Sequence, residues 1–210
     1  MTDSVPAIPY GWESAEQTTA HPYLLPAVVR NLRTVAAGRK CRVLDLGCGN
    51  GYVASVVAKE GHSVTGVDVS PDGIAIARKA HPGIEFELAS IYNDDLRRFS
   101  ERFDCVISLE VVEHLMYPKE LFRRSCEVLK PGGSLILSTP HHGYWKNLAL
   151  SIANGWDQHF NVEWDGGHVK FFSNRALAKM ALAAGLGNPR FEGVGRLPLL
   201  WKSTVMVVTR

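Results

Sequence analysis

The chain has 210 residues, of which 46% are hydrophobic, so it can bury one substantial core and is expected to form a single domain over residues 1–210. Lysine and arginine (23) nearly balance aspartate and glutamate (21) without any run of like charge, which makes a nucleic-acid partner unlikely and a small-molecule one the better expectation. No apolar run approaches the roughly 20 residues of a membrane span, and the first ten residues lack a secretion signal, so a cytoplasmic location is expected. The sequence leaves the oligomeric state open.

The amino-terminal region is expected to be a helical cap, residues 1–38. Residues 22–37 carry apolar side chains at helical spacing before Gly38, which predicts a helix that covers the sheet or the mouth of a ligand site. Tyr10, Trp12 and His21 either fold over that ligand or serve as packing anchors, and both interpretations stay open.

Strand-like and helix-like stretches then alternate along the chain. Strands are predicted near 41–46, 63–68, 84–89, 104–109 and 133–139, with helices near 51–60, 72–80, 94–100 and 118–130 between them. This alternation is the signature of a doubly wound α/β sheet. A helix near 173–184 and two β-rich stretches, 189–196 and 200–209, follow.

A glycine turn joins the first strand to the next helix. Gly47 and Gly49 allow a sharp bend and a close ligand approach, and Asp45 places a carboxylate beside it. Asp68 ends the second strand about 20 residues later, where a carboxylate could accept hydrogen bonds from a ribose. Such a turn is typical of nucleotide-like ligands but is also used for purely structural reasons.

The segment Asp-Leu-Gly-Cys-Gly-Asn-Gly, residues 45–51, resembles motif I of class I S-adenosylmethionine-dependent methyltransferases. Residues 103–110 and 129–135 resemble the fourth strand of that family and its turn into the fifth. The resemblance implies a Rossmann-like, mostly parallel seven-stranded sheet that closes with an antiparallel carboxyl-terminal hairpin. It also implies S-adenosyl-L-methionine as the methyl donor.

The resemblance assigns cofactor contacts to the carboxyl ends of the first four strands. The residues are Asp45, Gly47, Cys48, Gly49, Asp68, Val69, Ser90, Ile91 and Leu109. Ser90 marks a departure, because the family often has an Asp near this position that contacts the adenine amine. A serine hydroxyl can still form a hydrogen bond there, although a weaker one.

Three potential metal ligands follow the fourth strand. If the segment turns helically, Glu110 and His114 share a face with Glu113 nearby, and two carboxylates side by side favour a cation between them. The spacing alone favours a solvated turn in which His114 acts as a base. Glu-x-x-Glu-His resembles the metal motif of ubiquinone-pathway O-methyltransferases and of small-RNA 3′-terminal 2′-O-methyltransferases, which implies His168 as a fourth ligand and magnesium as the metal.

These residues favour O-methylation, because a hydroxyl must lose its proton and either a metal or His114 could assist that loss. His114 is therefore a predicted metal ligand or a predicted catalytic base, and His141, directly after the fifth strand, is the second catalytic candidate. The expected acceptor is a small phenolic or lipid-like molecule. An RNA 2′-O-methyltransferase, a small-amine N-methyltransferase and a noncatalytic cofactor-binding module remain alternatives.

The long segment after the fifth strand, residues 140–172, is predicted to be a lid-like insert. It is rich in aromatic residues and histidines, among them Trp145, His159 and Trp164. These side chains could surround an aromatic or lipid-like acceptor, or simply pack a small helix over the edge of the sheet.

Overall fold

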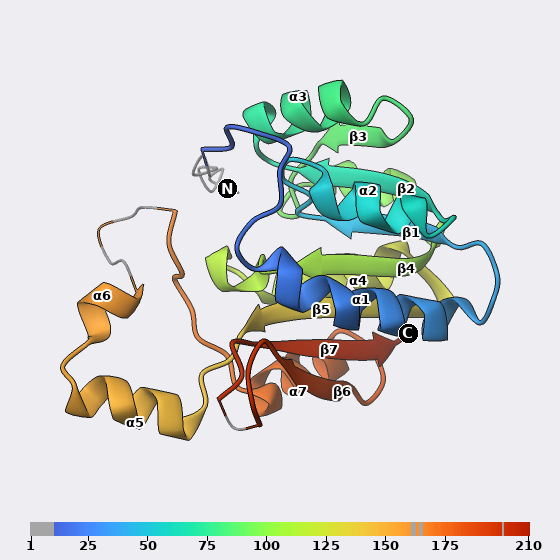
Figure 1. Ribbon diagram of the computed structural model, residues 1–210. Helices are drawn as coiled ribbons and strands as arrows, with labels where there is room; N and C mark the ends of the chain where they lie inside the picture. The colour runs from blue at the N-terminus through green and yellow to red at the C-terminus, as the bar shows by residue number, and fades with distance from the viewer. Residues whose placement is uncertain (1–10, 161–162, 164–165, 199) are drawn as a thin grey trace.

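The computed structural model describes residues 11–160, 163, 166–198 and 200–210, and its centre is a seven-stranded sheet (Figure 1). The strands are β1 (Arg42–Leu46), β2 (Ser63–Asp68), β3 (Glu85–Leu88), β4 (Phe103–Leu109), β5 (Leu129–Pro140), β6 (Arg190–Val194) and β7 (Ser203–Thr209). Their order is β3-β2-β1-β4-β5-β7-β6. Strands β1 to β5 pair in parallel, whereas β7 runs antiparallel to β5 and β6. The predicted sheet and its antiparallel closing hairpin are confirmed.

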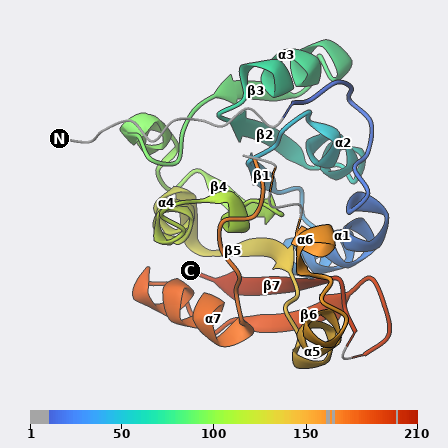
Figure 2. The same ribbon diagram turned by 90° about the vertical axis from the view of Figure 1, so that its left-hand side faces the viewer.

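Helices cover both faces of the sheet (Figures 1 and 2). One face carries α1 (His21–Ala36), α2 (Tyr52–Lys59) and α3 (Pro71–Ala80), and the other carries α4 (Lys119–Val128) and α7 (Asn174–Ala183). Where a helix was predicted for 94–100, the chain forms a short 3-10 helix, η1 (Asp94–Phe99). Its buried residues Leu96 and Phe99 are three apart, which is the repeat of a 3-10 turn.

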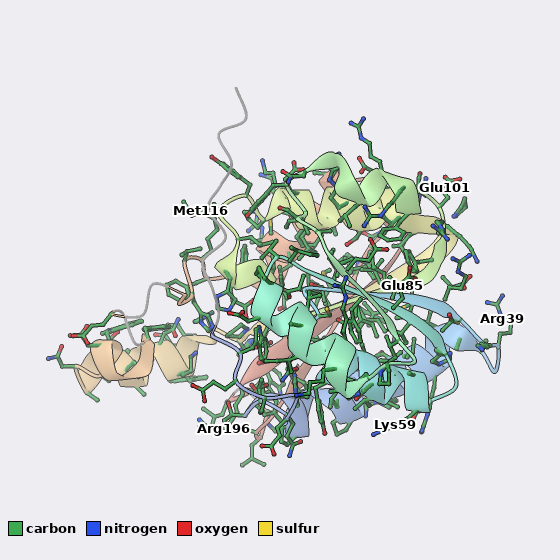
Figure 3. The ribbon with its side chains drawn as sticks, turned by 90° about the horizontal axis from the view of Figure 1, so that it is seen from above. Arg39, Lys59, Glu85, Glu101, Met116 and Arg196 are labelled. Carbon is green, nitrogen blue, oxygen red and sulfur yellow. The ribbon has the colours of Figure 1, made fainter. Side chains whose placement is uncertain are left out.

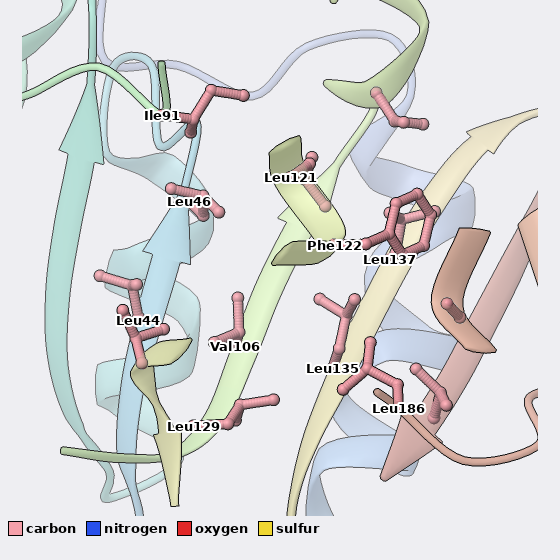
Figure 4. Packing of buried hydrophobic residues seen from close by; sticks show 14 of the residues in the cluster. Leu44, Leu46, Ile91, Val106, Leu121, Phe122, Leu129, Leu135, Leu137 and Leu186 are labelled. Carbon is pink, nitrogen blue, oxygen red and sulfur yellow. The ribbon is translucent and has the colours of Figure 1, made fainter. Parts of the chain in front are cut away.

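The central strands are buried on both faces, as strands of a doubly wound sheet must be. In β1, Val43 packs toward α1 and α2, whereas Leu44 and Leu46 belong to the opposite cluster with Leu121 and Phe122 of α4. Figure 4 shows this second cluster between the sheet and α4. The two apolar clusters hold β1 and β4 rigidly, so the turns that leave these strands start from fixed positions.

Strands β1 and β4 are neighbours whose connections leave to opposite faces of the sheet. The chain continues from β1 into α2 on one face and from β4 through η2 (Val112–His114) into α4 on the other. Open α/β sheets bind ligands beyond the carboxyl ends of the strands at such a point of divergence, so we expect the ligand site there. In Figure 3, Met116 and Arg196 lie toward this end of the molecule, and Arg39 and Glu101 lie toward the opposite end.

The segment after β5 forms two short helices, α5 (Tyr144–Ile152) and α6 (Trp156–Phe160). They extend from the body of the protein beyond the carboxyl end of β5 (Figure 1), and α5 contains no buried residue. Two of the aromatic residues singled out in the sequence, Tyr10 and Trp164, lie outside the described residues. Within the part of the chain that the structure describes, no helix is both long enough and apolar enough to cross a membrane.

Candidate active site

The turn between β1 and α2 depends on its glycines. Gly47 and Gly49 adopt left-handed φ angles of 84° and 50°. The N–H groups of Gly47 and Cys48 donate to the carbonyl of Val67 in β2, at 2.8 and 3.0 Å, which fixes the turn over the sheet edge. A Cβ at Gly47 would lie 2.5 Å from a methyl group of Val111, so a side chain does not fit there.

Two carboxylates, the buried Asp45 and the half-buried Asp68, lie beside this turn. Asp68 at the end of β2 accepts hydrogen bonds at 2.8 Å from the N–H groups of Gly49 and Ser70, while burial raises its pKa. Asp45 is 2% exposed, and its Oδ2 has no hydrogen-bond partner among the described residues. Burial, and secondarily the charge of Asp68, raises the pKa of Asp45 to about 7. A ligand with cationic groups and hydroxyls, such as S-adenosylmethionine, fits this pair of acids.

The remaining predicted cofactor residues lie along the same edge. Val69 follows β2, Ser90 and Ile91 follow β3, and Leu109 ends β4, so the sheet brings all the predicted cofactor residues to adjacent strand ends. The Ser90 hydroxyl accepts a hydrogen bond from the N–H of Tyr92 at 3.2 Å. Cys48 is 5% exposed and packs into the core, so its backbone, rather than its thiol, faces this edge.

Glu110 directly follows β4 in a left-handed conformation, with φ of 53°. Ser138 donates from its hydroxyl to one carboxylate oxygen at 2.7 Å, and Ser203 donates to the other at 3.3 Å. The Tyr23 hydroxyl lies 3.3 Å from the Ser203 hydroxyl, which connects α1 to this network. Burial raises the pKa of Glu110 to about 7.

A group of potential metal ligands lies next to Glu110. One ligand atom from each of Glu113, His114 and His168 falls within 4.8 Å of the others, although His168 is distant in sequence. Thr139 donates to one oxygen of the Glu113 carboxylate at 3.0 Å. The other oxygen, Oε1, is buried, has no hydrogen-bond partner among the described residues and lies 4.0 Å from Nε2 of His168. Burial, with the nearby charge of Glu110, raises the pKa of Glu113.

The two histidines of this group have distinct environments. The ring of His114 lies edge-on to that of His168, with centroids 4.9 Å apart. Nδ1 of His114 is 3.2 Å from the carbonyl of Gly167, and donation to that oxygen would leave the lone pair on Nε2. Burial lowers the pKa of His114, which favours the neutral imidazole that either a ligand or a base requires.

His141 is not part of this group of ligands. Its backbone N–H donates to the carbonyl of Lys202 at 2.8 Å, and its ring packs edge-on against Trp201. Burial, and secondarily the charge of Lys146, lowers the pKa of His141. The structure therefore places His141 against Trp201, whereas His114 contacts His168.

Several residues that shape the site have no motif of their own. The Ser108 hydroxyl, fully buried in β4, donates to the carbonyl of Leu46 at 2.7 Å and so holds the start of the glycine turn. Arg124 of α4 is 2% exposed and donates to the carbonyl of Ile91 at 3.1 Å. The sequence shows only an arginine within a predicted helix. Its supporting role can be recognised once the structure shows that Arg124 is buried and contacts Ile91.

Comparisons with known proteins agree with this fold. Residues 18–188 match the family model described as Methyltransferase domain. The chain is 34% identical over 174 residues to the ubiquinone biosynthesis O-methyltransferase of Nitrobacter winogradskyi, covering 79% of this chain and 64% of that protein. A Pyrococcus horikoshii structure superposes with a TM-score of 0.71 at 18% identity, over 93% of this chain and 92% of the other. The magnesium protoporphyrin IX methyltransferase of Synechocystis, solved with bound S-adenosylhomocysteine, gives 0.64 at 20% identity, over 89% and 81%.

The chain belongs to this methyltransferase family. Its glycine turn, its strand-two acid and its sheet order are those of class I S-adenosylmethionine-dependent methyltransferases, so the predicted resemblance is confirmed. The chain spans slightly less than two thirds of the length of the Nitrobacter relative.

Proposed function

We propose that this protein transfers the methyl group of S-adenosylmethionine to a hydroxyl of a small phenolic or lipid-like acceptor, with a divalent cation held by Glu113, His114 and His168. The observation that carries the proposal is the convergence of these three ligand atoms within 4.8 Å, at the strand edge that also carries the glycine turn. The names of the curated relatives support the choice of an oxygen acceptor.

The chemistry of the three side chains fits a cation. The buried Oε1 atom of Glu113 has no donor among the described residues, and a buried carboxylate without compensation is costly. A set of one carboxylate and two imidazoles suits several divalent metals, and magnesium is the one that the family resemblance implies. When bound, such an ion would supply a Lewis acid that lowers the pKa of an acceptor hydroxyl.

The protein's own residues would position the reaction. Asp45 and Asp68 would hold the cofactor at the glycine turn, so that donor and acceptor meet in an in-line arrangement. Thr139 fixes the Glu113 carboxylate, and the Gly167 carbonyl orients His114. Glu110 lies outside the three-residue group, so its role as a fourth ligand stays a prediction.

The insert would form the acceptor side of the site. The backbone N–H groups of Val169 and Lys170 donate to the carbonyl of Glu113, at 3.0 and 3.2 Å, which attaches the end of the insert to the metal-ligand segment. Phe171 packs edge-on against His142, with ring centroids 4.6 Å apart, and is 54% exposed. Aromatic surface next to the ligand group suits a phenolic or lipid-like acceptor, and residues 140–172 would then act as its lid.

Removal of the metal should abolish methyl transfer to a phenol and leave cofactor binding intact. The test dialyses the protein against EDTA, then measures transfer from S-adenosylmethionine to a panel of small phenols, a small amine and a short RNA. We expect phenol methylation to return on addition of magnesium or manganese, while the Kd for S-adenosylhomocysteine stays unchanged throughout.

The three acceptors separate the alternatives. Phenol methylation that is indifferent to EDTA would remove the metal from the proposal and leave His114 as the base. Transfer to the amine alone, or salt-dependent binding and methylation of the RNA, would replace the proposed acceptor class.

A further inference from the structure

The segment from Trp12 to His21 crosses from the start of α3 to the start of α1 (Figures 1 and 2). Asn50, the fourth residue of the glycine turn, fastens it there. The side-chain amide of Asn50 donates to the carbonyls of Ser14 and Glu16, both at 2.8 Å, and its oxygen accepts from the N–H of Tyr52 at 3.2 Å. Asn50 is 2% exposed, and both of its amide hydrogens and its oxygen are used.

Trp12 lies on two glycines at the carboxyl-end edge of the sheet, one in the turn after β1 and one at the start of α3. A Cβ at Gly49, in the turn after β1, would collide with the indole ring. A Cβ at Gly73, in the first turn of α3 after β2, would lie 2.9 Å from Cδ1 of Trp12. The indole therefore bridges the turn that follows Asp45 and the start of the helix that follows Asp68.

The other end of the segment is anchored by His21, the first residue of α1. Its ring stacks on that of Tyr52, with centroids 5.0 Å apart and planes 7° from parallel, and its Nδ1 accepts from the N–H of Thr18 at 3.0 Å. Burial lowers the pKa of His21 to about 4, so the ring is neutral at physiological pH and this contact persists. Asn50 and His21 thus hold the segment at both sides of the glycine turn.

We propose that Trp12 is a cofactor-binding residue that forms the outer wall of the S-adenosylmethionine site, and that Asn50 is the positioning residue that places this wall. A plain packing anchor would be expected to pack into one of the two apolar clusters, and neither cluster includes Trp12. Trp12 instead contacts the Cα surfaces of Gly49 in the turn after β1 and of Gly73 at the start of α3, and both amide hydrogens of Asn50 bond the main chain of the same segment. Cofactor binding is the property this wall would control, whichever acceptor is methylated.

The test measures S-adenosylhomocysteine binding by calorimetry in the full chain. We expect Trp12→Ala and Asn50→Ala each to raise the Kd at least tenfold, Trp12→Phe to recover most of the loss, and the double variant to bind no more weakly than the worse single variant. The last result follows if Asn50 acts by placing Trp12. Gln17→Ala is the matched control, because Gln17 lies in the same segment and contacts the exposed Tyr52 hydroxyl, at 3.4 Å, so its Kd should stay within twofold of wild type.

A second measurement needs no variant. Hydrogen exchange of the wild-type amides in residues 12–20 should slow at least tenfold when S-adenosylhomocysteine is added, whereas exchange in α7 should not change. The proposal fails if Trp12→Ala binds S-adenosylhomocysteine with the wild-type Kd, or if the binding free energies lost in Trp12→Ala and Asn50→Ala sum in the double variant. It also fails if the exchange rates of residues 12–20 do not change when the ligand is added.

Discussion

Replacing Asp45 by asparagine is expected to weaken S-adenosylmethionine binding about tenfold to a hundredfold. Without ligand, the same variant should become more stable relative to the wild-type protein as the pH rises. The binding loss corresponds to one charge-assisted contact of about 1.5–3 kcal/mol. The stability gain arises because Asp45 is buried without full compensation, which raises its pKa from about 4 to about 7.

The sign of the pH effect follows from the direction of this shift. An acid with a raised pKa binds more protons in the folded state than in the unfolded state between the two pKa values, so its ionisation destabilises the fold as the pH rises from about 4 to about 7. The amide that replaces the carboxyl group in the variant cannot ionise. The difference in unfolding free energy between variant and wild type should therefore grow in favour of the variant over that range and level off above it.

Urea unfolding of both proteins at several pH values, without ligand, measures this difference, and calorimetry measures the binding. Asp72→Asn is a control for the removal of one carboxylate, since Asp72 is exposed in the first turn of α3. A pH-independent difference for Asp45→Asn would show that the carboxylate is not held in the environment described here. Unchanged cofactor affinity would remove Asp45 from the binding site.

The sequence predicts the fold well because each element carries a local signal. Strands such as β1 and β4 are short apolar runs bounded by turn residues, and the glycines at 47 and 49 are required by left-handed φ angles that local sequence can indicate. The 3-10 helix at Asp94–Phe99 shows the limit, because its tightness depends on burying two side chains against α4 and the sheet. Tertiary packing therefore determines that this segment forms a 3-10 helix, and no local sequence pattern predicts it.

The same division applies to the site. The position of the cofactor residues follows from topology, because parallel neighbouring strands end at one edge. The hydrogen-bond partners of the acidic side chains do not follow from the topology. Ser203, which contacts Glu110, lies 93 residues away on a strand that returns antiparallel. Likewise, the helical face that would unite Glu110 with His114 is interrupted by the left-handed backbone of Glu110. The convergence of His168 with Glu113 agrees with the resemblance and could not be obtained from spacing alone.

Replacing Glu113 by glutamine should abolish metal-stimulated methyl transfer and weaken manganese binding more than about a hundredfold. Loss of a residue that merely supports a ligand costs about tenfold to a hundredfold in metal affinity, and loss of the charged ligand itself should exceed this. Glutamine has the same shape and can still accept the Thr139 hydrogen bond, so the fold should tolerate it. Removal of a buried, uncompensated carboxylate should leave the metal-free protein at least as stable as wild type.

Two further variants, Thr139→Val and Glu110→Gln, distinguish residues that bind the cation directly from residues that only position Glu113. Thr139→Val leaves the Glu113 charge and removes one hydrogen bond, so manganese affinity should fall by no more than about a hundredfold. Glu110 acts on Glu113 through its charge while its own oxygens are bonded to Ser138 and Ser203, so Glu110→Gln should cost about tenfold.

Calorimetric titration with manganese ranks the three variants by their metal affinity. Binding of S-adenosylhomocysteine is the control for an intact cofactor site. A loss for Glu110→Gln equal to that for Glu113→Gln would make Glu110 a direct ligand and give the four-ligand site that the family resemblance implies. Wild-type manganese affinity in Glu113→Gln would instead remove the cation from this site. The buried Oε1 atom of Glu113 would then have to be satisfied by protonation, which its raised pKa permits.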